Sequence, residues 1–398
     1  MAVQARGGLS RDEVVFIETT GRGSLDYYAQ KLAAELPVAV RSVDIYARTA
    51  AGFNVPLFSR TALTALREDA AFVRTLSRER ALIHLPNHHM GRYGALLASP
   101  YVVTVHDLIR MLDLDREDAL IHHPNVRDRL LLRLDRLGIG RAAHIVAVSE
   151  ATKRDLVARL DIAPERVTVV YEGVDHARFS PVARPPVSYR YLLYVGSEQP
   201  RKDMPTLLRA FARIRADRRF SDYRLVKIGA AGGGEAPFRQ ATVRAIRDCG
   251  LEDAVQFLGR VPEDELPAWY SGAELLIFPS RYEGFGLPPL EAMACACPVL
   301  ISDAAALREV GGGAALVAPA GDHAAFAARA IEILTNGALR RSLRQRGLAR
   351  AATFSWARTA RETMAVWDAV LAAVTAKRAP TFPARRLART GVGGTGPT

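Results

Sequence analysis

Short runs of apolar and β-branched residues alternate along the chain with longer stretches in which apolar residues recur every three or four positions. The short runs predict strands, which in the first half lie at 14–18, 81–85, 101–105, 144–148 and 167–171. A second series follows at 191–195, 224–228, 255–258, 274–278, 298–301 and 314–317. The longer stretches have the period of an amphipathic helix, as at 206–216 and 323–335. This alternation predicts an α/β fold whose parallel sheets are covered on both faces by helices.

A proline-rich segment separates the two series of predicted strands. Three prolines lie within residues 180–186, so we expect a linker there and one Rossmann-like half on either side. Ligands of such sheets bind beyond the carboxyl ends of the strands, and two facing halves therefore predict a cleft between them. After residue 376 the chain is rich in Pro, Gly and Arg, which predicts a disordered basic tail over residues 377–398.

Length and composition are those of a soluble globular protein. The chain has 398 residues, of which 49% are hydrophobic and 24% charged, so a mostly disordered chain is excluded. No apolar run approaches the roughly 18–20 residues that a membrane-spanning helix needs, and the first residues lack the apolar stretch of a signal peptide. We therefore expect a cytoplasmic protein. Its three cysteines are too few for a disulfide framework and are expected to be buried thiols.

The net charge of +12 narrows the range of partners. It suits phosphate-bearing ligands or anionic lipid better than nucleic acid, because the sequence has neither zinc-finger spacing nor basic repeats with interleaved aromatics. Residues 127–141 hold five arginines and two aspartates with leucines between them. This stretch predicts either an amphipathic helix packed in the first half or a peripheral contact with the inner face of a membrane.

The segment 283–291 carries the strongest chemical signal, because it places two glutamates and two glycines between an apolar strand and a helix that opens with two prolines. Gly284 and Gly286 let the backbone come close to a ligand, and the amides at the start of the helix can bind a phosphate. Glu283 and Glu291 can accept hydroxyl groups of one elongated ligand at two points. The plain structural alternative is one glutamate that caps the helix and another on a solvated face.

Two further candidates follow other predicted strands. Arg201 and Lys202 come soon after strand 191–195 and Gly196, and two cations at the carboxyl edge of a sheet can clamp a diphosphate. Paired basic residues are also common on solvated surfaces. His106 ends a strand of the first half, where it either faces the cleft or is a hydrogen-bonded core histidine.

The remaining patterns argue against cofactors. Gly21 and Gly23 follow the first predicted strand, but Asp26 stands where a dinucleotide fingerprint needs its third glycine, so a nicotinamide-dependent dehydrogenase is not indicated. We place these three residues on the side of the cleft that the first half forms. Asp113 and Asp115 have a D-x-D spacing that binds metal in another fold, but that fold lacks both the spacing of Glu283 and Glu291 and the linker between two halves. The histidines lack convergent spacing. We therefore expect no metal and no other cofactor.

Taken as a set, these segments resemble the retaining glycosyltransferases of family 4, the glycogen-synthase-like group with the GT-B fold. Glu283 to Glu291 is similar to the E-x7-E motif of that family, and residues 275–303 match its donor-site block almost throughout. The resemblance covers roughly residues 100–375 well and is weaker before them. Further similar segments are 148–156, 171–179, 194–211 and 257–270.

The resemblance implies a division into two facing Rossmann-like domains. Residues 1–183 would form the acceptor-side domain, and residues 184–355 would form the domain that binds the nucleotide sugar. A helix over residues 356–375 would pack back onto the first domain.

The resemblance also implies roles for the donor-site residues. Glu291 would hold the ribose of the nucleotide, and Glu283 would hold hydroxyls of the donor sugar. The amides of Phe285, Gly286 and Leu287 would meet the distal phosphate.

The other implied roles concern the charge of the diphosphate and the base of the nucleotide. Arg201 and Lys202 would neutralise the diphosphate leaving group, and His106 would lie near the sugar. Arg260 and Val261 would border the base. Many members carry arginine straight after the glycine that is Gly196 here, whereas this chain has Ser197, so Arg201 would supply that charge alone.

The function that follows from the resemblance is metal-independent transfer of a hexose, with retention, from a nucleotide-diphosphate sugar to a glycan or lipid-linked acceptor. The donor would be GDP-mannose or UDP-glucose. Mannose is favoured because the Leu287-Pro288-Pro289-Leu290 form of the motif is common among mannosyl- and rhamnosyl-transferring members. Two alternatives stay open, namely a nucleotide-sugar 2-epimerase of the same fold and a non-catalytic protein that binds nucleotide sugars.

Overall fold

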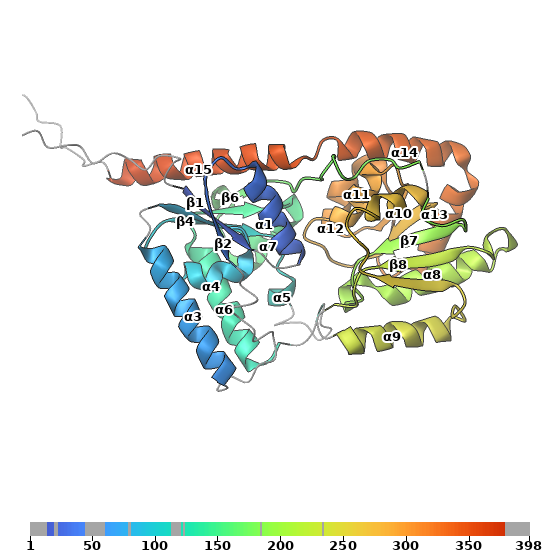
Figure 1. Cartoon of the computed structure of the whole chain (residues 1–398), viewed down its shortest axis with the longest axis horizontal. Coiled ribbons are helices and arrows are strands. Elements are labelled where there is room, and N and C mark those ends of the chain that lie inside the picture. Colours follow the sequence, from blue (N-terminus) through green and yellow to red (C-terminus); the bar gives the residue numbers. More distant parts are fainter. Residues whose placement is uncertain are drawn as a thin grey trace, which may run out of the picture.

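The chain folds into two α/β halves that lie side by side (Figure 1). Each half contains a six-stranded parallel sheet flanked by helices, so the prediction of two Rossmann-like domains is confirmed. This computed structural model describes residues 14–19, 23–43, 60–78, 81–112, 121, 124–183, 185–232 and 235–378. The predicted tail lies outside these ranges from residue 379 onward.

The first sheet has the strand order β2-β1-β3-β4-β5-β6. Strand β2 was not predicted, because Arg41 and Ser42 interrupt its apolar run. As an edge strand, β2 does not need the continuous apolar run of a strand buried on both faces. The bounds are β1 Val14–Thr19, β2 Ala39–Val43, β3 Leu82–Leu85, β4 Tyr101–Val105, β5 His144–Ala147 and β6 Val167–Val169.

The second sheet has the order β12-β11-β10-β7-β8-β9. The direction in which strands are added reverses between the neighbours β7 and β10, and this switch point is where open parallel sheets bind their ligands. The bounds are β7 Tyr191–Val195, β8 Arg224–Ile228, β9 Val255–Gly259, β10 Leu275–Phe278, β11 Val299–Ser302 and β12 Leu316–Ala318.

The helices cover both faces of the sheets, so each central strand is buried on two sides. In β1, Val14 and Phe16 join one hydrophobic cluster, whereas Val15 and Ile17 join another. This alternation follows from the two-residue period of a strand. The helices of the first half are α1 Ser24–Glu35, α3 Arg60–Ser77, α4 Gly91–Gly94, α5 Ile109–Leu112, α6 Val126–Arg141 and α7 Glu150–Leu160.

The second half has its own set of helices. Within the described ranges, no helix is at once long enough and apolar enough to cross a bilayer. The bounds are α8 Met204–Arg215, α9 Glu235–Asp248, α10 Leu266–Gly272, α11 Leu287–Ala294, α12 Ala305–Gly311, α13 His323–Thr335 and α14 Gly337–Ala351.

The last helix, α15 (Trp356–Arg378), leaves the second half and packs along the first (Figure 1). Its Trp367 is fully buried, and the indole Nε1 donates a hydrogen bond to Nδ1 of His84 over 3.1 Å. Thr359 donates to the carbonyl of Tyr171 at 2.8 Å. The chain therefore passes between the halves twice, once near residues 180–190 and once before α15.

Candidate active site

Two loops meet at the switch point of the second sheet. β7 leads through Gly196 into the 3-10 helix Pro200–Lys202, and β10 leads into the glycine-containing loop before α11. The amide of Arg281 donates to the carbonyl of Arg201 at 2.7 Å, so the two loops are joined. The sequence had placed both loops at the edge of one sheet, and the strand order makes them neighbours.

Glu283 lies between the two candidate cations. Its Oε2 is 2.8 Å from Nη1 of Arg201, and its Oε1 is 2.6 Å from Nζ of Lys202. The three side chains are between 9% and 15% exposed, so this is a nearly buried cluster with one net positive charge. A buried cluster of this sign attracts an anion.

The pKa shifts within the cluster follow from burial and from these contacts. Burial alone would raise the pKa of Glu283, but Arg201 and Lys202 together lower it to about 2. Burial lowers the pKa of Lys202 to about 8, and the neighbouring Arg201 acts in the same direction, whereas Glu283 opposes both. Glu283 therefore helps to keep Lys202 charged near neutral pH.

Helix α11 begins beside this cluster. Gly286 has φ 127°, a left-handed value that favours glycine, and the helix runs from Leu287 with proline in its first turn. The side chain of Phe285 is buried, with its ring 6.2 Å from that of Tyr171 and 5.9 Å from that of Phe354. The loop thus presents its backbone, and the positive end of the helix dipole, toward a ligand.

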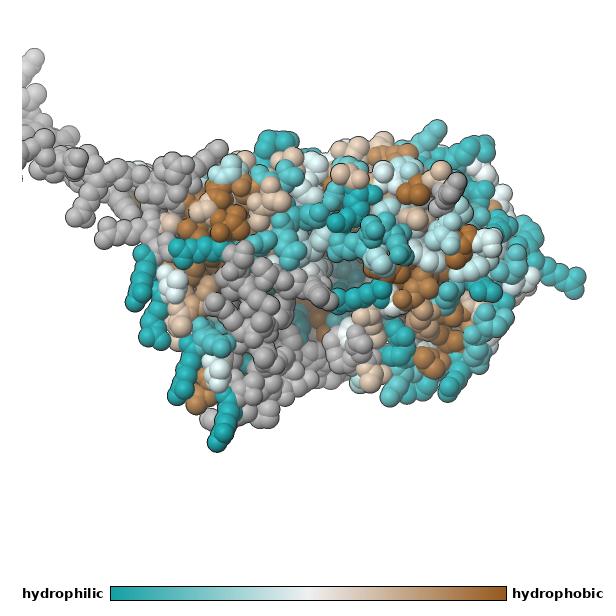
Figure 2. All heavy atoms as spheres, in the orientation of Figure 1, coloured by the Kyte–Doolittle hydropathy of each residue, from teal (hydrophilic) through white to brown (hydrophobic). Residues whose placement is uncertain are grey.

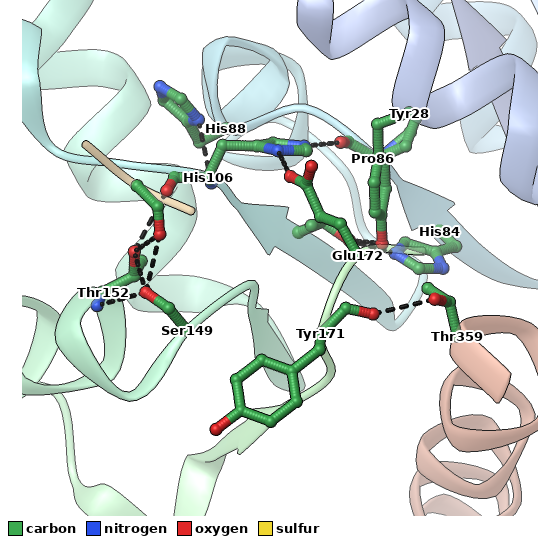
Figure 3. Close-up of polar contacts among 12 residues, drawn as sticks. Tyr28, His84, Pro86, His88, His106, Ser149, Thr152, Tyr171, Glu172 and Thr359 are labelled. Atoms are coloured by element: carbon green, nitrogen blue, oxygen red, sulfur yellow. Dashed lines mark hydrogen bonds and ion pairs between the residues drawn. The ribbon is translucent and has the colours of Figure 1, made fainter. Parts of the chain in front are cut away.

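Gly284 joins the loop before α11 to the first half of the chain. Its carbonyl accepts hydrogen bonds from Oγ of Ser149 at 2.7 Å and from Oγ1 of Thr152 at 3.3 Å. A Cβ at position 284 would lie 1.9 Å from the carbonyl oxygen of His106, so only glycine fits. Ser149 and Thr152 also bond to each other at the start of α7 (Figure 3).

A further contact joins the halves at the same helix. Both carboxylate oxygens of Glu309, from α12, accept backbone amides at the N-terminus of α7, namely those of Glu150 at 2.7 Å and Ala151 at 3.1 Å. The helix dipole of α7 favours this carboxylate. In the space-filling view, the surface is hollowed between the two halves and hydrophilic side chains border the hollow (Figure 2).

His106 directly follows β4, and its ring is held inside the first half (Figure 3). Nδ1 lies 2.9 Å from Oε1 of Glu172, and Nε2 lies 2.9 Å from the carbonyl oxygen of Pro86. Tyr28 packs edge-on against the ring at 4.5 Å. Both ring nitrogens of His106 therefore already have a partner within the first half. A sugar hydroxyl could bond this ring only in exchange for one of these partners.

Glu291 lies within α11, on the second half. Its Oε2 accepts the hydroxyl of Tyr270 at 2.8 Å. Burial raises the pKa of Glu291 to about 7, and the Tyr270 hydrogen bond opposes this shift only in part. Unlike Glu283, it lies beside Tyr270 rather than in the Arg201–Lys202 cluster, so the two motif glutamates occupy different electrostatic surroundings.

A cavity of about 560 Å³ lies beyond the carboxyl ends of β8 and β9. Arg260 lines it, whereas Val261 packs against the hydrophobic core. Both residues were expected to border the base of the nucleotide. The described residues around the cavity are Ala230, Ala231, Ala236, Arg239, Gly259 and Arg260.

A buried ion cluster beside this cavity was not predicted. Lys227 is 0% exposed and donates to the carbonyl of Gly229, while its Nζ lies 2.9 Å from Oε1 of Glu198. Arg239 bonds the same carboxylate at 2.7 Å and stacks on Phe257 at 4.1 Å. Lys227 stands in the apolar run of β8, and that buried position is the signal that could have identified it.

The candidates of the acceptor side lie at the start of α1. Asp26 is fully buried, and its Oδ2 accepts the amide of Gly23 at 2.9 Å, so it caps the helix. Gly21 lies outside the described residues, as do Asp113 and Asp115. Among the described residues, no three His, Cys, Asp or Glu side chains are grouped as metal ligands. All three cysteines are free, and Cys295 and Cys297 are buried.

Comparison with known families decides the identity of this arrangement. Residues 8–178 match the family described as Glycosyltransferase Family 4, and residues 176–350 match the family described as Glycosyl transferases group 1. The two matches together cover both halves of the chain. The chain belongs to the family 4 glycosyltransferases. The resemblance inferred from the E-x7-E motif is therefore confirmed at the level of the family.

Several curated relatives of this glycosyltransferase are themselves named as glycosyltransferases or mannosyltransferases. O-antigen chain mannosyltransferase B of Escherichia coli is 32% identical over 252 residues, which cover 61% of this chain and 65% of the relative. MMP alpha-(1->4)-mannosyltransferase of Mycolicibacterium hassiacum is 30% identical over 65% of this chain and 66% of its own length. The chain thus spans slightly less than two thirds of these two relatives. D-inositol 3-phosphate glycosyltransferase of Kineococcus radiotolerans is 28% identical over 88% of this chain and 91% of its own.

Solved structures share the fold of this glycosyltransferase. Sucrose-phosphate synthase from Thermosynechococcus elongatus superposes with a TM-score of 0.72 at 22% identity, over 90% of this chain and 99% of that one. Anabaena HepE in complex with UDP-glucose has a TM-score of 0.72 at 19% identity, over 89% and 99% of the two chains. At these identities the likeness concerns the two-domain architecture.

Proposed function

We propose that this family 4 glycosyltransferase is a retaining hexosyltransferase that needs no metal ion. Its donor is a nucleotide-diphosphate sugar, GDP-mannose or UDP-glucose, and its acceptor is a glycan or a lipid-linked glycan. Two mannosyltransferases among its relatives support mannose as the hexose. The name of the HepE complex, with UDP-glucose bound in the same fold, supports a nucleotide sugar as the donor.

One observation carries the proposal. Arg201 and Lys202 follow β7, the start of α11 follows β10, and these neighbouring strands form the switch point of the second sheet. Two cations and a helix N-terminus therefore converge on one crevice, with Glu283 between the cations. A diphosphate is a ligand with the charge and shape for this set.

In the proposed reaction, charge develops on the leaving diphosphate as its bond to the sugar breaks. Arg201, Lys202 and the α11 dipole are fixed before the reaction begins, so they stabilise this charge without reorganising. The sugar becomes oxocarbenium-like, and the acceptor hydroxyl attacks the face from which the diphosphate leaves. The proposal assigns no protein nucleophile.

We assign each of the two motif glutamates to a different part of the donor. We assign the ribose hydroxyls to Glu291, which the hydroxyl of Tyr270 orients at 2.8 Å. We assign the hexose hydroxyls to Glu283, which lies with the two cations. We assign His106 the role of positioning the loop before α11. Its backbone carbonyl faces Gly284 of that loop, and its ring is held by Glu172.

The test is a panel of nucleotide sugars with the purified chain. Calorimetric titration of GDP-mannose, UDP-glucose and the two free diphosphates identifies the base, and release of nucleoside diphosphate in the presence of acceptor glycans measures transfer. NMR of the product gives the anomeric configuration, which we expect to match the donor. Release of nucleotide with epimerised free sugar and no acceptor would identify an epimerase. Binding without turnover on any acceptor would indicate a non-catalytic protein.

A further inference from the structure

Helix α6 buries both of its acids beside Leu132 and Ile139 and leaves other aliphatic side chains exposed, which is unusual for a surface helix. Asp128 and Asp135 are fully buried. Val126, Leu130 and Leu137 are 77%, 48% and 51% exposed. The sequence left open whether the leucines of residues 127–141 pack inside, and the structure places part of them on the surface.

The buried acids are paired inside the first half. Asp135 accepts two hydrogen bonds from the Arg92 guanidinium, at 2.9 and 2.7 Å. Burial would raise the pKa of Asp135, but Arg92 outweighs it and the pKa lies below its ordinary value. Asp128 lies 3.5 Å from Arg110. The negative charges of α6 are therefore neutralised by arginines of other elements, and the outer face of α6 keeps its own positive charges.

A pocket of about 280 Å³ opens beside this face, where α5, α6 and α7 meet. Its lining combines arginines with aliphatic side chains, and none of the described residues that line it is acidic. Arg159 bonds Asp155 within its own helix at 3.1 Å. The arginines of the pocket are Arg129, Arg133, Arg136 and Arg159.

We propose that the outer face of α6 and this pocket dock the protein on the anionic surface of a lipid bilayer. The guanidinium groups would bind the phosphates of acidic headgroups, and the exposed Val126, Leu130 and Leu137 would enter the interface between headgroups and acyl chains. Basic side chains alone would suit any polyanion. Exposed aliphatic side chains along the same helix distinguish a lipid surface from a nucleic acid.

The pocket lies close to the candidate active site. Leu108 lines it two residues after His106, and the hydroxyl of Tyr282, next to Glu283, bonds Asp155 of the adjoining α7. Docking through α6 would hold the cleft near the bilayer, where a lipid-linked acceptor would be found. The docking itself does not rest on the transfer reaction, and its test uses no donor sugar.

The test is co-sedimentation of the full chain with vesicles of phosphatidylglycerol or of phosphatidylcholine. We expect binding to phosphatidylglycerol vesicles only, and we expect 0.5 M salt to release it, because salt screens these charges. Arg133→Glu with Arg136→Glu should weaken this binding at least about tenfold. Leu130→Gln with Leu137→Gln should weaken it while leaving the salt dependence. Arg209→Glu with Arg213→Glu on α8, an equal change of charge in the other half, should have no comparable effect.

Each remaining outcome counts against the proposal. The proposal is overturned if the wild-type protein does not bind phosphatidylglycerol vesicles, or if it binds both vesicle types equally, whatever the variants do. If the α6 and α8 charge variants weakened vesicle binding equally, the net charge of the protein, and not the face of α6, would account for the binding. Competition by inorganic phosphate at constant ionic strength, with no effect of the leucine changes, would assign the pocket to a soluble anion. Circular dichroism and thermal melting check the fold, and Arg133→Gln with Arg136→Gln repeats the test with a milder change.

Discussion

Nζ of Lys202 lies 2.6 Å from Oε1 of Glu283, within a cluster whose third member is Arg201. This contact means that the proposed sugar-binding carboxylate also sets the charge of a proposed phosphate-binding cation. Burial shifts the pKa values of two groups, Lys202 and Glu291, so that both change their charge close to neutral pH.

A bell-shaped pH dependence of kcat/KM for the donor should follow. The pKa of Glu291 is raised to about 7, so its carboxylate forms, and ribose binding improves, as the pH rises through 7. The pKa of Lys202 is lowered to about 8, so its positive charge is lost as the pH rises through 8. We expect roughly tenfold loss per pH unit on either side. Lys202→Arg should keep the acidic limb and move the alkaline limb upward. A flat profile between pH 6 and 9 would contradict the assignment of both groups.

The two motif glutamates should differ when each is replaced by glutamine. A hydrogen bond to a charged group contributes roughly 1.5–3 kcal/mol, or about one to two decades in affinity. Glu291→Gln should weaken nucleotide sugar and free nucleotide alike by that factor. Glu283→Gln should weaken free nucleotide less than Glu291→Gln does, because it acts there only through the charge of Lys202, and it should lower turnover and alter donor-sugar choice. Calorimetry and steady-state rates measure both effects, and melting temperatures serve as the control. Equal losses of free nucleotide binding would remove the assigned roles.

Turnover should withstand removal of divalent metal. Arg201, Lys202 and the N-terminus of α11 provide the positive charge that the leaving diphosphate requires. Initial rates with excess EDTA should stay within about twofold of those without it, whereas Arg201→Gln should lower kcat by two decades or more. Complete loss of activity with EDTA, with recovery on addition of Mg²⁺ or Mn²⁺, would show that this part of the mechanism is wrong.

Gly284→Ala should separate the two halves at the cleft. The added Cβ would lie 1.9 Å from the carbonyl oxygen of His106, so the loop must move away from the first half. We expect a larger radius of gyration in small-angle scattering and at least about a hundredfold lower turnover, because misplacement by 1 Å can have that effect. Gly313→Ala, where an added Cβ meets nothing within 4 Å, is the matched control. Normal turnover of Gly284→Ala would show that the contact is not needed.

Glu198→Gln should destabilise the second half strongly. Lys227 is 0% exposed, and loss of the carboxylate 2.9 Å from its Nζ leaves a buried charge without its counterion. Such a loss costs about 3–5 kcal/mol of unfolding free energy. The double variant Lys227→Met with Glu198→Gln should recover part of it. Urea denaturation of the four proteins of this cycle measures the coupling, and additive effects would argue against a buried pair.

Periodicity and local motifs made much of the fold predictable. All the expected strands are present, because fully buried parallel strands such as β10 appear as continuous apolar runs. Arg201, Lys202 and Glu283 could be predicted to lie together because all three stand in loops that follow strands of the second half. The edge strand β2 could not be, since Arg41 interrupts its pattern.

Contacts between distant residues could not be predicted. Glu172 lies 66 residues from His106 along the chain. Lys227 and Glu198 come together because strands β7 and β8 pair. The inward turn of the acids on α6 depends on where Arg92 and Arg110 fall in space, which no helical period specifies. The pattern of residues 127–141 was therefore compatible with two opposite orientations.

The return of α15 to the first half has a mechanical consequence. The two segments that pass between the halves run beside each other, since Val174 and Ser355 form a parallel bridge and the His176 ring lies 2.9 Å from the carbonyl of Phe354. Two adjoining crossings restrict the movement of one half relative to the other more than a single linker would. We therefore expect a chain cut before α15 to hold its two halves less firmly in place.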